Sequence, residues 1–469
     1  MTATRSSGAP HQHPYDSVLD MVGWTPLVRL NRVVDGIRTP VYGKCEFMNP
    51  GGSVKDRVGL AMIEAAEREG SLRPGGTIVE GTSGNTGLAL AMAAAIKGYR
   101  CIFTMPDKMS SEKVRLLRAF GAEVIITPTA VPPDHPENYV VKAKSIAASM
   151  PGAILANQFY NQANPAAHAA TTGPELWTQS EGRITHFFAG AGTGGTITGT
   201  GRYLKERKPD VRICGVDPEG SLIAPFFNTG TMVEGAPYKV EGLGNDKIPG
   251  TLDLDVIDEF TTVTDADAFS MTRRLVREEG LFVGGSAGLI VHGAIEKARQ
   301  LDDPEAFVVA VLCDWGEHYL SKTFDDEWMR ENGFLERVRR RSAGELVAQR
   351  SGAPTSLLTV APNTPVQMAL STITTHGVSQ LPVMKDGECV GSVRESGLMR
   401  AVIEDPTLLE RSVETVMGAP YPVVDATTDS EEVSHLLRSN AAVLVRVDSR
   451  ISSILTRFDA VRTLTQGTA

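Results

Sequence analysis

The sequence Asn49-Pro50-Gly51-Gly52-Ser53-Val54-Lys55-Asp56-Arg57 joins a glycine turn to the start of a predicted helix. Its two adjacent glycines allow the backbone to turn tightly and to approach a ligand closely. Ser53 favours the start of a helix, and the apolar run 58–63 continues it. The stretch therefore predicts that Lys55 lies on the first turn of a helix, where a lysine can form a Schiff base. Taken alone, it would fit an ordinary surface lysine better, so the rest of the chain decides.

The composition is that of a soluble globular protein with more than one domain. The chain has 469 residues, of which 42% are hydrophobic and 22% are charged, and a chain of this length normally divides into two or three domains. The net charge of −10 argues against binding to nucleic acid or to an anionic membrane. No apolar run reaches the roughly 18 residues that a membrane span needs.

The cysteines and the N-terminus favour a cytoplasmic protein. Five scattered cysteines, with no Cys-x-x-Cys spacing, fit reduced thiols better than disulfides or a zinc site; they are Cys45, Cys101, Cys214, Cys313 and Cys389. The histidines show no metal-ligand spacing, so no metal site is expected. Residues 1–14 lack the apolar segment of a signal peptide and are expected to form a disordered tail.

Predicted strands and helices alternate through residues 15–324, which is typical of a parallel α/β sheet with helices on both faces. The predicted strands include residues 41–46, 78–80, 101–105, 123–126, 184–189, 212–217 and 306–313. The predicted helices include residues 88–97, 110–120, 139–149 and 265–279.

The composition changes near residue 325. Residues 325–353 are charged and poorly periodic, so we interpret them as a linker. Two weakly similar halves follow, residues 354–408 and 409–469, each with a predicted helix and a pair of strands. Such a repeat indicates a pseudo-twofold pair of small domains packed together.

Two glycine-rich loops stand at predicted strand-to-helix junctions. Gly192-Thr193-Gly194-Gly195-Thr196 presents successive backbone N–H groups, two hydroxyls and a helix N-terminus, which suits a phosphate. It lacks the lysine of a Walker loop and the spacing of a dinucleotide fingerprint, so a nucleotide is not favoured. Thr82-Ser83-Gly84-Asn85-Thr86-Gly87 offers neutral donors that suit a carboxylate. The alternative for each loop is a simple turn, but a phosphate site, a carboxylate site and a lysine together indicate pyridoxal phosphate and an amino-acid substrate.

In their order along the chain, these motifs resemble the fold-type II pyridoxal-phosphate enzymes of β-replacement. The resemblance covers residues 16–320, includes Gly284-Gly285-Ser286-Ala287-Gly288, and implies a core of two open parallel-sheet α/β subdomains. The two C-terminal halves resemble a tandem of CBS domains, known as a Bateman module. Core, linker and tandem together resemble the cystathionine β-synthase family, of the type without a haem segment, which implies a homodimer or a homo-oligomer built from dimers.

The resemblance implies a role for each motif residue. Lys55 forms the internal aldimine and moves the α-proton, and Asn85 bonds the ring hydroxyl of the cofactor. The residues implied to hold the phosphate are Gly192, Thr193, Gly194, Gly195 and Thr196. The residues implied to bind the substrate carboxylate are Thr82, Ser83, Thr86 and Gln158. Ser286 faces the pyridine nitrogen, and because a neutral hydroxyl does not hold that nitrogen protonated as a carboxylate would, loss of a β-substituent is favoured over transamination.

The implied reaction is condensation of L-serine, or an activated serine, with homocysteine to give L-cystathionine through an aminoacrylate. Alternatives are a cysteine synthase, which joins O-acetylserine or O-phosphoserine to sulfide, and 2,3-diaminopropionate synthesis. Asn245 is the candidate specificity residue because several relatives carry tyrosine there, and Cys313-Asp314-Trp315 also departs from the Pro-Asp of relatives. A non-enzyme alternative is an adenosyl-ligand sensor with a scaffold-like core.

In the tandem, the resemblance implies an adenosyl-ligand motif with a hydroxyl residue followed by an aspartate three positions later. The second half keeps Thr456 and Asp459, whereas the first half has Arg394 and Gly397 at those places. We therefore predict at most one adenosyl-ligand site. The alternative is that this site is empty and the tandem only dimerises.

Overall fold

The computed structural model describes residues 14–82, 84–107, 109, 111–132, 134–335, 341–348 and 356–459. The chain divides into two compact units, residues 1–336 and residues 337–469. The predicted tail lies outside the described residues except for its last residue, and so do parts of the predicted linker. Within the described ranges, no helix is both long and apolar enough to cross a membrane.

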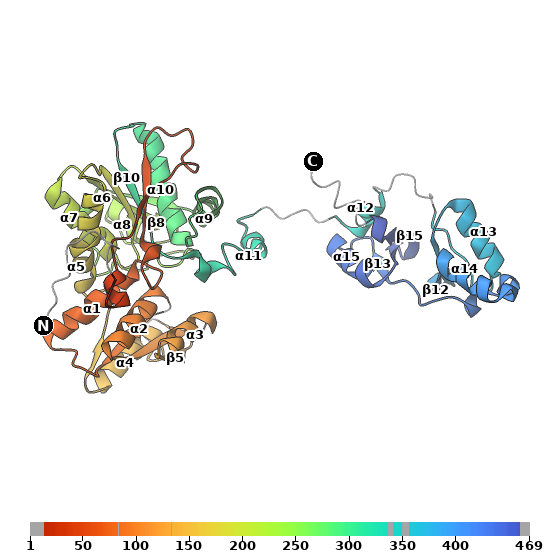
Figure 1. Cartoon of the computed structure of the whole chain (residues 1–469), viewed down its shortest axis with the longest axis horizontal. Coiled ribbons are helices and arrows are strands. Elements are labelled where there is room, and N and C mark those ends of the chain that lie inside the picture. The colour runs from red at the N-terminus through yellow and green to blue at the C-terminus, as the bar shows by residue number, and fades with distance from the viewer. Residues whose placement is uncertain are drawn as a thin grey trace. The chain divides into compact units, whose positions relative to one another are not determined.

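The larger sheet of the first unit has six strands in the order β1-β2-β10-β7-β8-β9. Figure 1 labels two of them, β8 and β10. Their bounds are β1 Leu27–Arg29, β2 Val41–Cys45, β7 His186–Gly190, β8 Arg212–Pro218, β9 Glu259–Val263 and β10 Val308–Leu312. All neighbours pair in parallel except β1, which runs antiparallel to β2 at the edge. Parallel strands align the carboxyl ends of successive strands, where sites form in open sheets.

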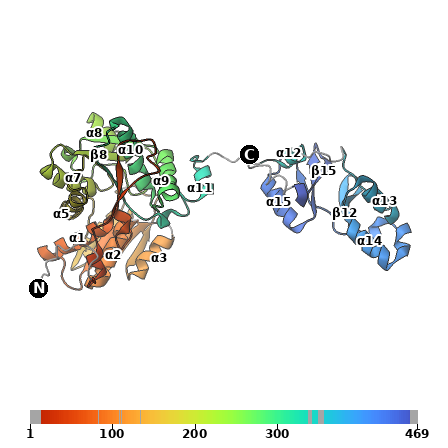
Figure 2. The ribbon, with the colours of Figure 1, turned by 45° about the horizontal axis from the view of Figure 1, so that its top comes forward.

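The smaller sheet has the order β5-β4-β3-β6, and all of its strands are parallel. Its strands are β3 Thr77–Gly81, β4 Arg100–Pro106, β5 Glu123–Thr127 and β6 Ala153–Leu155. The helices α1 Lys55–Glu69, α2 Asn85–Lys97, α3 Ser111–Ala119 and α4 Tyr139–Ser149 gather beside this sheet (Figures 1 and 2). The predicted fold class, a core of two parallel-sheet α/β subdomains, is confirmed.

Most of the remaining elements of the first unit pack with the larger sheet, whereas Leu19 of the first 3-10 turn joins the core of the smaller subdomain. The helices are α5 Ala163–Ala170, α6 Thr172–Gln179, α7 Gly195–Arg207, α8 Ile223–Thr229, α9 Asp265–Glu279 and α10 Gly285–Leu301, and the 3-10 turns are η1 Val18–Met21, η2 Glu46–Met48, η3 Leu254–Val256 and η4 Gly316–Tyr319. The sequence patterns missed α5 and α6, which are short and interrupted by Pro165 and by the sequence Thr171-Thr172-Gly173.

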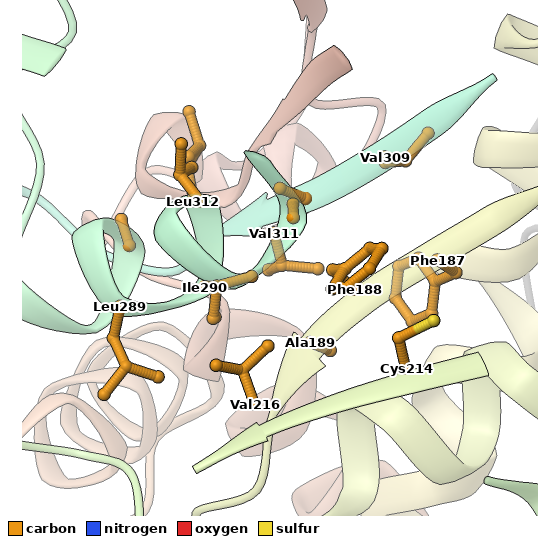
Figure 3. Close-up of a cluster of buried hydrophobic side chains, with 14 of the residues drawn as sticks. Phe187, Phe188, Ala189, Cys214, Val216, Leu289, Ile290, Val309, Val311 and Leu312 are labelled. Carbon is orange, nitrogen blue, oxygen red and sulfur yellow. The ribbon is translucent and has the colours of Figure 1, made fainter. Parts of the chain in front are cut away.

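The core of the larger subdomain lies between helix α10 and the strands β7, β8 and β10. Figure 3 shows Phe188, Val216, Ile290 and Val311 meeting there, and each is at most 1% exposed. Burying a side chain of this kind stabilises the fold by about 1.5–3 kcal/mol. This packing fixes the start of α10 and the end of β10, which both border the candidate site.

Both ends of the segment that we interpreted as a linker fold onto a unit. Helix α11 (Asp326–Glu331) buries Met329, and the ring of Trp328 lies 5.6 Å from that of Phe269. Helix α12 (Ala343–Ala348) buries Ala343 and Leu346 within the second unit. Charge and weak periodicity predict a linker here, because helices as short as α11 and α12 contain too few apolar residues to give a helical pattern.

The second unit contains two similar halves. The first has α13 Val366–His376, the hairpin β11 Gln380–Lys385 with β12 Glu388–Arg394, and α14 Glu395–Glu404. The second has β13 Val423–Asp425, α15 Ser430–Ser439 and the hairpin β14 Ala442–Val447 with β15 Arg450–Thr456, and the 3-10 turns η5 Pro406–Glu410 and η6 Val413–Thr415 lie between the halves. An apolar cluster around Tyr421 and Leu444 includes Met384 and Cys389 of the first half. The helix followed by an antiparallel hairpin recurs in each half, as the predicted repeat requires. Figure 2 labels one strand of each hairpin, β12 and β15.

Candidate active site

Lys55 is the first residue of helix α1, as predicted. Its backbone N–H donates to the hydroxyl of Ser53 over 3.2 Å. Gly52, in the turn before the helix, has a φ of +79°, which favours glycine. The backbone N–H of Val54 donates to the carbonyl of Cys313 over 2.8 Å. The lysine loop is therefore held against the chain that follows β10.

A cavity joins Lys55 to the glycine-threonine loop, residues 192–196. Gly194 has a φ of +83°, and helix α7 begins at Gly195, so its N-terminal N–H groups belong to the loop. A Cβ atom added at Gly195 would lie 1.9 Å from Oδ1 of Asn164, and one added at Gly192 would lie 2.2 Å from the carbonyl oxygen of Gly242. Only glycines permit this close packing, which brings backbone donors to the cavity.

Three side chains that the sequence patterns did not single out for the site hold this loop. Asn164 donates from Nδ2 to the hydroxyl of Thr193 over 2.9 Å, and the hydroxyl of Thr251 donates to the carbonyl of Thr193 over 2.6 Å. Nε2 of His168 lies 3.1 Å from the hydroxyl of Thr196. They do not belong to one sequence motif with the loop, so the sequence patterns do not predict them.

His168 is fully buried and is held in its neutral form. Burial lowers the pKa of His168 to about 3, and the charge of Arg57 acts in the same direction. Its Nδ1 lies 2.8 Å from the hydroxyl of Thr172 on α6. The neutral ring therefore connects Thr172 to Thr196 of the loop, and its sequence carries no metal-ligand pattern that could have marked it.

Asn85 begins helix α2 and points its amide toward a buried carboxylate. Its Nδ2 donates to Oδ2 of Asp314 over 2.7 Å, and the hydroxyl of Tyr319 donates to the same oxygen over 2.6 Å. Burial raises the pKa of Asp314, and the hydrogen bonds from Tyr319 and Asn85 oppose that shift. Asp314 was visible in the sequence only as part of an atypical segment.

Ser286 is the second residue of helix α10 and is buried. Its side chain lies near the thiol of Cys313 and lowers the pKa of that thiol slightly against the effect of burial, and Cys313 lines the cavity of Lys55. Burial raises the pKa of Cys313 to about 12, so the thiol stays protonated at neutral pH. The dipeptide Cys313-Asp314 thus links three predicted site residues, namely Lys55, Ser286 and Asn85.

The predicted carboxylate-binding residues meet at the end of strand β3. Thr82 and Thr86 are buried, and the Thr86 hydroxyl donates to Oε1 of Gln158 over 2.6 Å. The backbone carbonyl of Gln158 accepts from Nδ2 of Asn164 over 3.0 Å, the same amide that holds the glycine-threonine loop. Ser83, which belongs to this prediction, lies outside the described residues.

Asn245 lies on the other side of the glycine-threonine loop. Its Nδ2 donates to the carbonyl of Gly192, and its backbone N–H donates to the hydroxyl of Ser221 over 3.0 Å. The amide of the candidate specificity residue is therefore engaged with the loop. Nearby, Glu241 forms an ion pair of 2.8 Å with Lys113 on α3. This ion pair joins the two subdomains.

A cluster of buried charges lies under the lysine helix. Arg57 donates to both oxygens of Glu46 and both oxygens of Glu175, over 2.6–2.8 Å. Lys44 donates to Glu175 over 2.7 Å, and all four side chains are at most 4% exposed. Although burial favours the neutral acid, the charge of Arg57 holds the pKa of Glu46 below its usual value. The cluster fixes the first turn of α1 to β2 and α6.

A larger cavity of about 1030 Å³ opens beside Gly52 and Asn85. Much of its lining is apolar and exposed, including Met48, Phe120 and Leu320. In the second unit, the hydroxyl and the backbone N–H of Thr456 both lie 2.7 Å from Oδ2 of Asp459. Across the part of the chain that the structure describes, no group of three or more His, Cys, Asp or Glu side chains is arranged to hold a metal ion.

The residues present fit pyridoxal phosphate. Backbone N–H groups and threonine hydroxyls at the start of α7 suit its phosphate. A Cβ atom at the glycines of this loop would clash with neighbouring atoms, so glycine is needed for the loop to adopt this conformation. A lysine suits its aldehyde, the amide of Asn85 suits its ring hydroxyl, and the hydroxyl of Ser286 suits its ring nitrogen.

Comparisons with known proteins agree with this assignment. A family described as pyridoxal-phosphate dependent enzyme matches residues 18–314, and the CBS domain family matches residues 354–404. Cystathionine beta-synthase of Oryctolagus cuniculus is 40% identical over 452 residues, which cover 93% of this chain and 82% of that protein. The protein of the same name from Dictyostelium discoideum is 37% identical over 456 residues, which cover 95% and 91%.

Two solved structures resemble about two thirds of the chain. The crystal structure of an O-ureido-L-serine synthase has a TM-score of 0.61 and 40% sequence identity, and the match covers 68% of this chain and 100% of that one. A hydrogen sulfide-producing enzyme from Fusobacterium nucleatum has a TM-score of 0.60 and 35% identity, and the match covers 66% and 99%.

Proposed function

The chain belongs to the pyridoxal-phosphate dependent enzyme family and, within it, to the cystathionine beta-synthase family, and we propose that it condenses L-serine with homocysteine to give L-cystathionine. The observation that carries this proposal is that Lys55 and four residues of the loop, Gly192, Thr193, Gly194 and Thr196, line the same small cavity. The family relationship extends over both units, because the relatives align with 93–95% of the chain. This favours cystathionine formation over the activities named for the two solved structures, which match 66–68% of the chain.

When bound, pyridoxal phosphate supplies an electron sink for the bonds broken at Cα of the substrate. We assign Lys55 to carry the cofactor and to remove and return the α-proton through its amine. The loop 192–196 holds the phosphate by backbone N–H groups and hydroxyls, while Asn85 donates to the ring hydroxyl and Ser286 faces the ring nitrogen. The hydroxyl of serine leaves as water, and the sulfur of homocysteine bonds to the β-carbon in its place.

Thr82, Ser83, Thr86 and Gln158 are assigned to the substrate carboxylate. Two of them support this directly, because the hydroxyl of Thr86 and the side chain of Gln158 already bond to each other at the end of β3. A carboxylate that enters there meets neutral donors beside the helix start of α2. Asn245 remains our proposal for the residue that tunes the choice of nucleophile.

A second β-replacement activity is the alternative for the same site. The named O-ureido-L-serine synthase is 40% identical to this chain over its catalytic part, as similar as the cystathionine beta-synthase of Oryctolagus cuniculus over both units. The alternatives are therefore a cysteine synthase or another transfer to serine, such as 2,3-diaminopropionate synthesis. They differ from the main proposal only in the nucleophile and the leaving group.

We propose that the enzyme works as a homodimer. Met48, Leu116, Phe120, Trp315 and Leu320 are 37–55% exposed and line one cavity of the first unit. An exposed apolar surface of this kind is normally covered, and a second copy related by twofold symmetry covers it most simply. The free cysteines in the described ranges support a reducing compartment, the cytoplasm.

For the second unit we propose residues 354–408 and 409–469 as two CBS domains and one adenosyl-ligand site. Thr456 and Asp459 form it, because their hydroxyl and carboxylate lie together at the end of β15 and suit phosphate and ribose hydroxyls. Residues 15–324 form the catalytic domain in this proposal, and residues 325–353 connect the two units.

The test is a product assay on purified protein loaded with pyridoxal phosphate. Serine and homocysteine should give cystathionine, identified by mass spectrometry. Lys55→Ala should lower the rate by about 100-fold or more, because general acid–base catalysis alone contributes that much. Lys97→Ala, whose side chain pairs with Glu67 away from the site, is the matched control and should retain the rate. An undiminished rate in Lys55→Ala, or no product from the loaded wild-type protein, contradicts the proposal.

A further inference from the structure

Asp314 lies where three segments of the candidate site meet. Asp314 forms an antiparallel β-bridge with Ser53 of the lysine loop. Its backbone carbonyl accepts a hydrogen bond from the backbone N–H of Gly284 over 3.1 Å. Its side chain reaches Asn85 at the start of helix α2. One residue therefore contacts the lysine loop, the turn that precedes Ser286 and the helix that carries Asn85.

The carboxylate of Asp314 is sealed from solvent and makes few bonds. It is 2% exposed, and Oδ2 accepts both from Asn85 Nδ2 over 2.7 Å and from the Tyr319 hydroxyl over 2.6 Å. Among the described residues, Oδ1 has no hydrogen-bond partner. An unpaired buried acceptor is destabilising, so Oδ1 does not stabilise the fold through a hydrogen bond.

The surrounding residues are shaped around this carboxylate. A Cβ atom added at Gly284 would lie 2.4 Å from Asp314 Oδ1 and 2.4 Å from the ring of Tyr319, so only glycine leaves room for both. Burial raises the pKa of the Tyr319 hydroxyl well above its usual value, so this group stays protonated and donates. Tyr319 thereby holds Asp314 Oδ2 in the position where it accepts the hydrogen bond from Asn85.

We propose that Asp314, held by Tyr319, is a positioning residue that fixes the orientation of the Asn85 amide toward the cofactor ring. An amide presents a donor at one end and an acceptor at the other, and a carboxylate accepts only. Bonding to Asp314 therefore selects the NH₂ end of Asn85 for this side of the pocket and leaves its second N–H for another acceptor. The inference rests on the proposed function, because it assigns that acceptor to the ring hydroxyl of pyridoxal phosphate.

The consequence concerns the cofactor itself. A donated N–H stabilises the ionised ring oxygen, whereas an amide free to rotate also presents its carbonyl, which repels it. Hydrogen bonds to charged groups are stronger than neutral ones. Loss of the Asp314 carboxylate should therefore shift the bound cofactor from the form with an ionised ring oxygen toward the form with a neutral one, by about tenfold.

The experiment compares the absorbance of bound pyridoxal phosphate in the wild-type protein, Asp314→Asn, Asn85→Ala and the double variant at one pH. Asp314→Asn keeps the shape of the side chain but replaces a group that only accepts with an amide that also presents N–H donors to Asn85. The orientation of Asn85 is then no longer fixed, and we expect the ratio of the two absorbing forms to shift in the same direction as in Asn85→Ala. The double variant should show no further shift, because both changes remove the same interaction. A purely structural role would instead give additive effects.

Tyr319→Phe keeps the test decisive if Asp314→Asn does not fold. It removes one of the two bonds to Oδ2, and we expect a smaller shift in the same direction. Asp258→Asn is the control, because this carboxylate bonds to Lys205 and to the backbone N–H of Ile213 and should leave the ratio unchanged. A wild-type ratio in Asp314→Asn, or additive shifts, overturns the inference, whereas failure of the wild-type protein to bind the cofactor overturns the proposed function.

Discussion

Replacing Arg57 with Met should destabilise the catalytic unit by about 3–5 kcal/mol, the cost of removing one partner from a buried ion cluster. Arg57 makes four hydrogen bonds of 2.6–2.8 Å to Glu46 and Glu175. Its side chain is 1% exposed, and the carboxylates are 0% and 4% exposed. After the substitution, both acids stay buried and Lys44 alone faces Glu175.

Urea unfolding followed by tryptophan fluorescence measures this loss. The four tryptophans of the chain lie at positions 24, 177, 315 and 328, all within the first unit, so their signal reports that unit alone. The control is Arg202→Met, because the Arg202–Asp253 pair is partly exposed at 48% and 27% and should contribute only about 0–1 kcal/mol.

A double variant separates the charge effect from lost packing. Adding Glu46→Gln to Arg57→Met removes one of the orphaned carboxylates and should restore part of the lost stability. Two results would refute this reasoning: a loss of less than about 1 kcal/mol in Arg57→Met, or a double variant that is less stable than the single one.

Three further predictions concern the glycine-threonine loop, the buried His168 and the proposed adenosyl-ligand site of the second unit. Gly195→Ala should weaken retention of pyridoxal phosphate by about tenfold or more in equilibrium dialysis, because the added Cβ would lie 1.9 Å from Asn164 Oδ1, and retention equal to wild type would argue against the cradle. Burial lowers the pKa of His168 to about 3, so the neutral ring stabilises the fold fully above pH 6.5. As the pH falls from 6.5 toward 3, the free energy of unfolding should decrease by about 1.4 kcal/mol per pH unit because of this residue. His168→Gln should flatten this part of the plot of unfolding free energy against pH, and an unchanged slope would contradict the assignment. Asp459→Ala should abolish the heat of binding of an adenosyl ligand in calorimetry, and undiminished binding would place the ligand elsewhere.

The fold was predictable because its signals are local. The start of α1 at Lys55 follows from a glycine turn and a helix-favouring serine, and α9 is bounded by the capping residue Thr264 and by Gly280. The parallel sheets follow from the alternation of strands with helices. The short helices α5 and α6 were missed because each has only 8 residues, which is too few for a clear pattern.

The site was predictable only where one motif carries the chemistry. Lys55 and the loop 192–196 are predicted from their glycines and hydroxyl residues, and in the structure they line one cavity. Asn164 and His168 act through contacts between segments distant in the sequence, so no spacing reveals them. Asp314 is a single acid after a strand, and its importance depends on the burial and the bonds that the tertiary fold creates.

This enzyme is expected to join serine to homocysteine rather than to another nucleophile. One competition assay tests it most directly: the loaded protein receives L-serine and O-acetylserine together with equal concentrations of homocysteine, sulfide and ammonia, and all products are quantified by mass spectrometry. We predict that cystathionine formed from serine is the main product. Cysteine or 2,3-diaminopropionate as the main product would contradict the claim, while leaving the cofactor site and the fold as described.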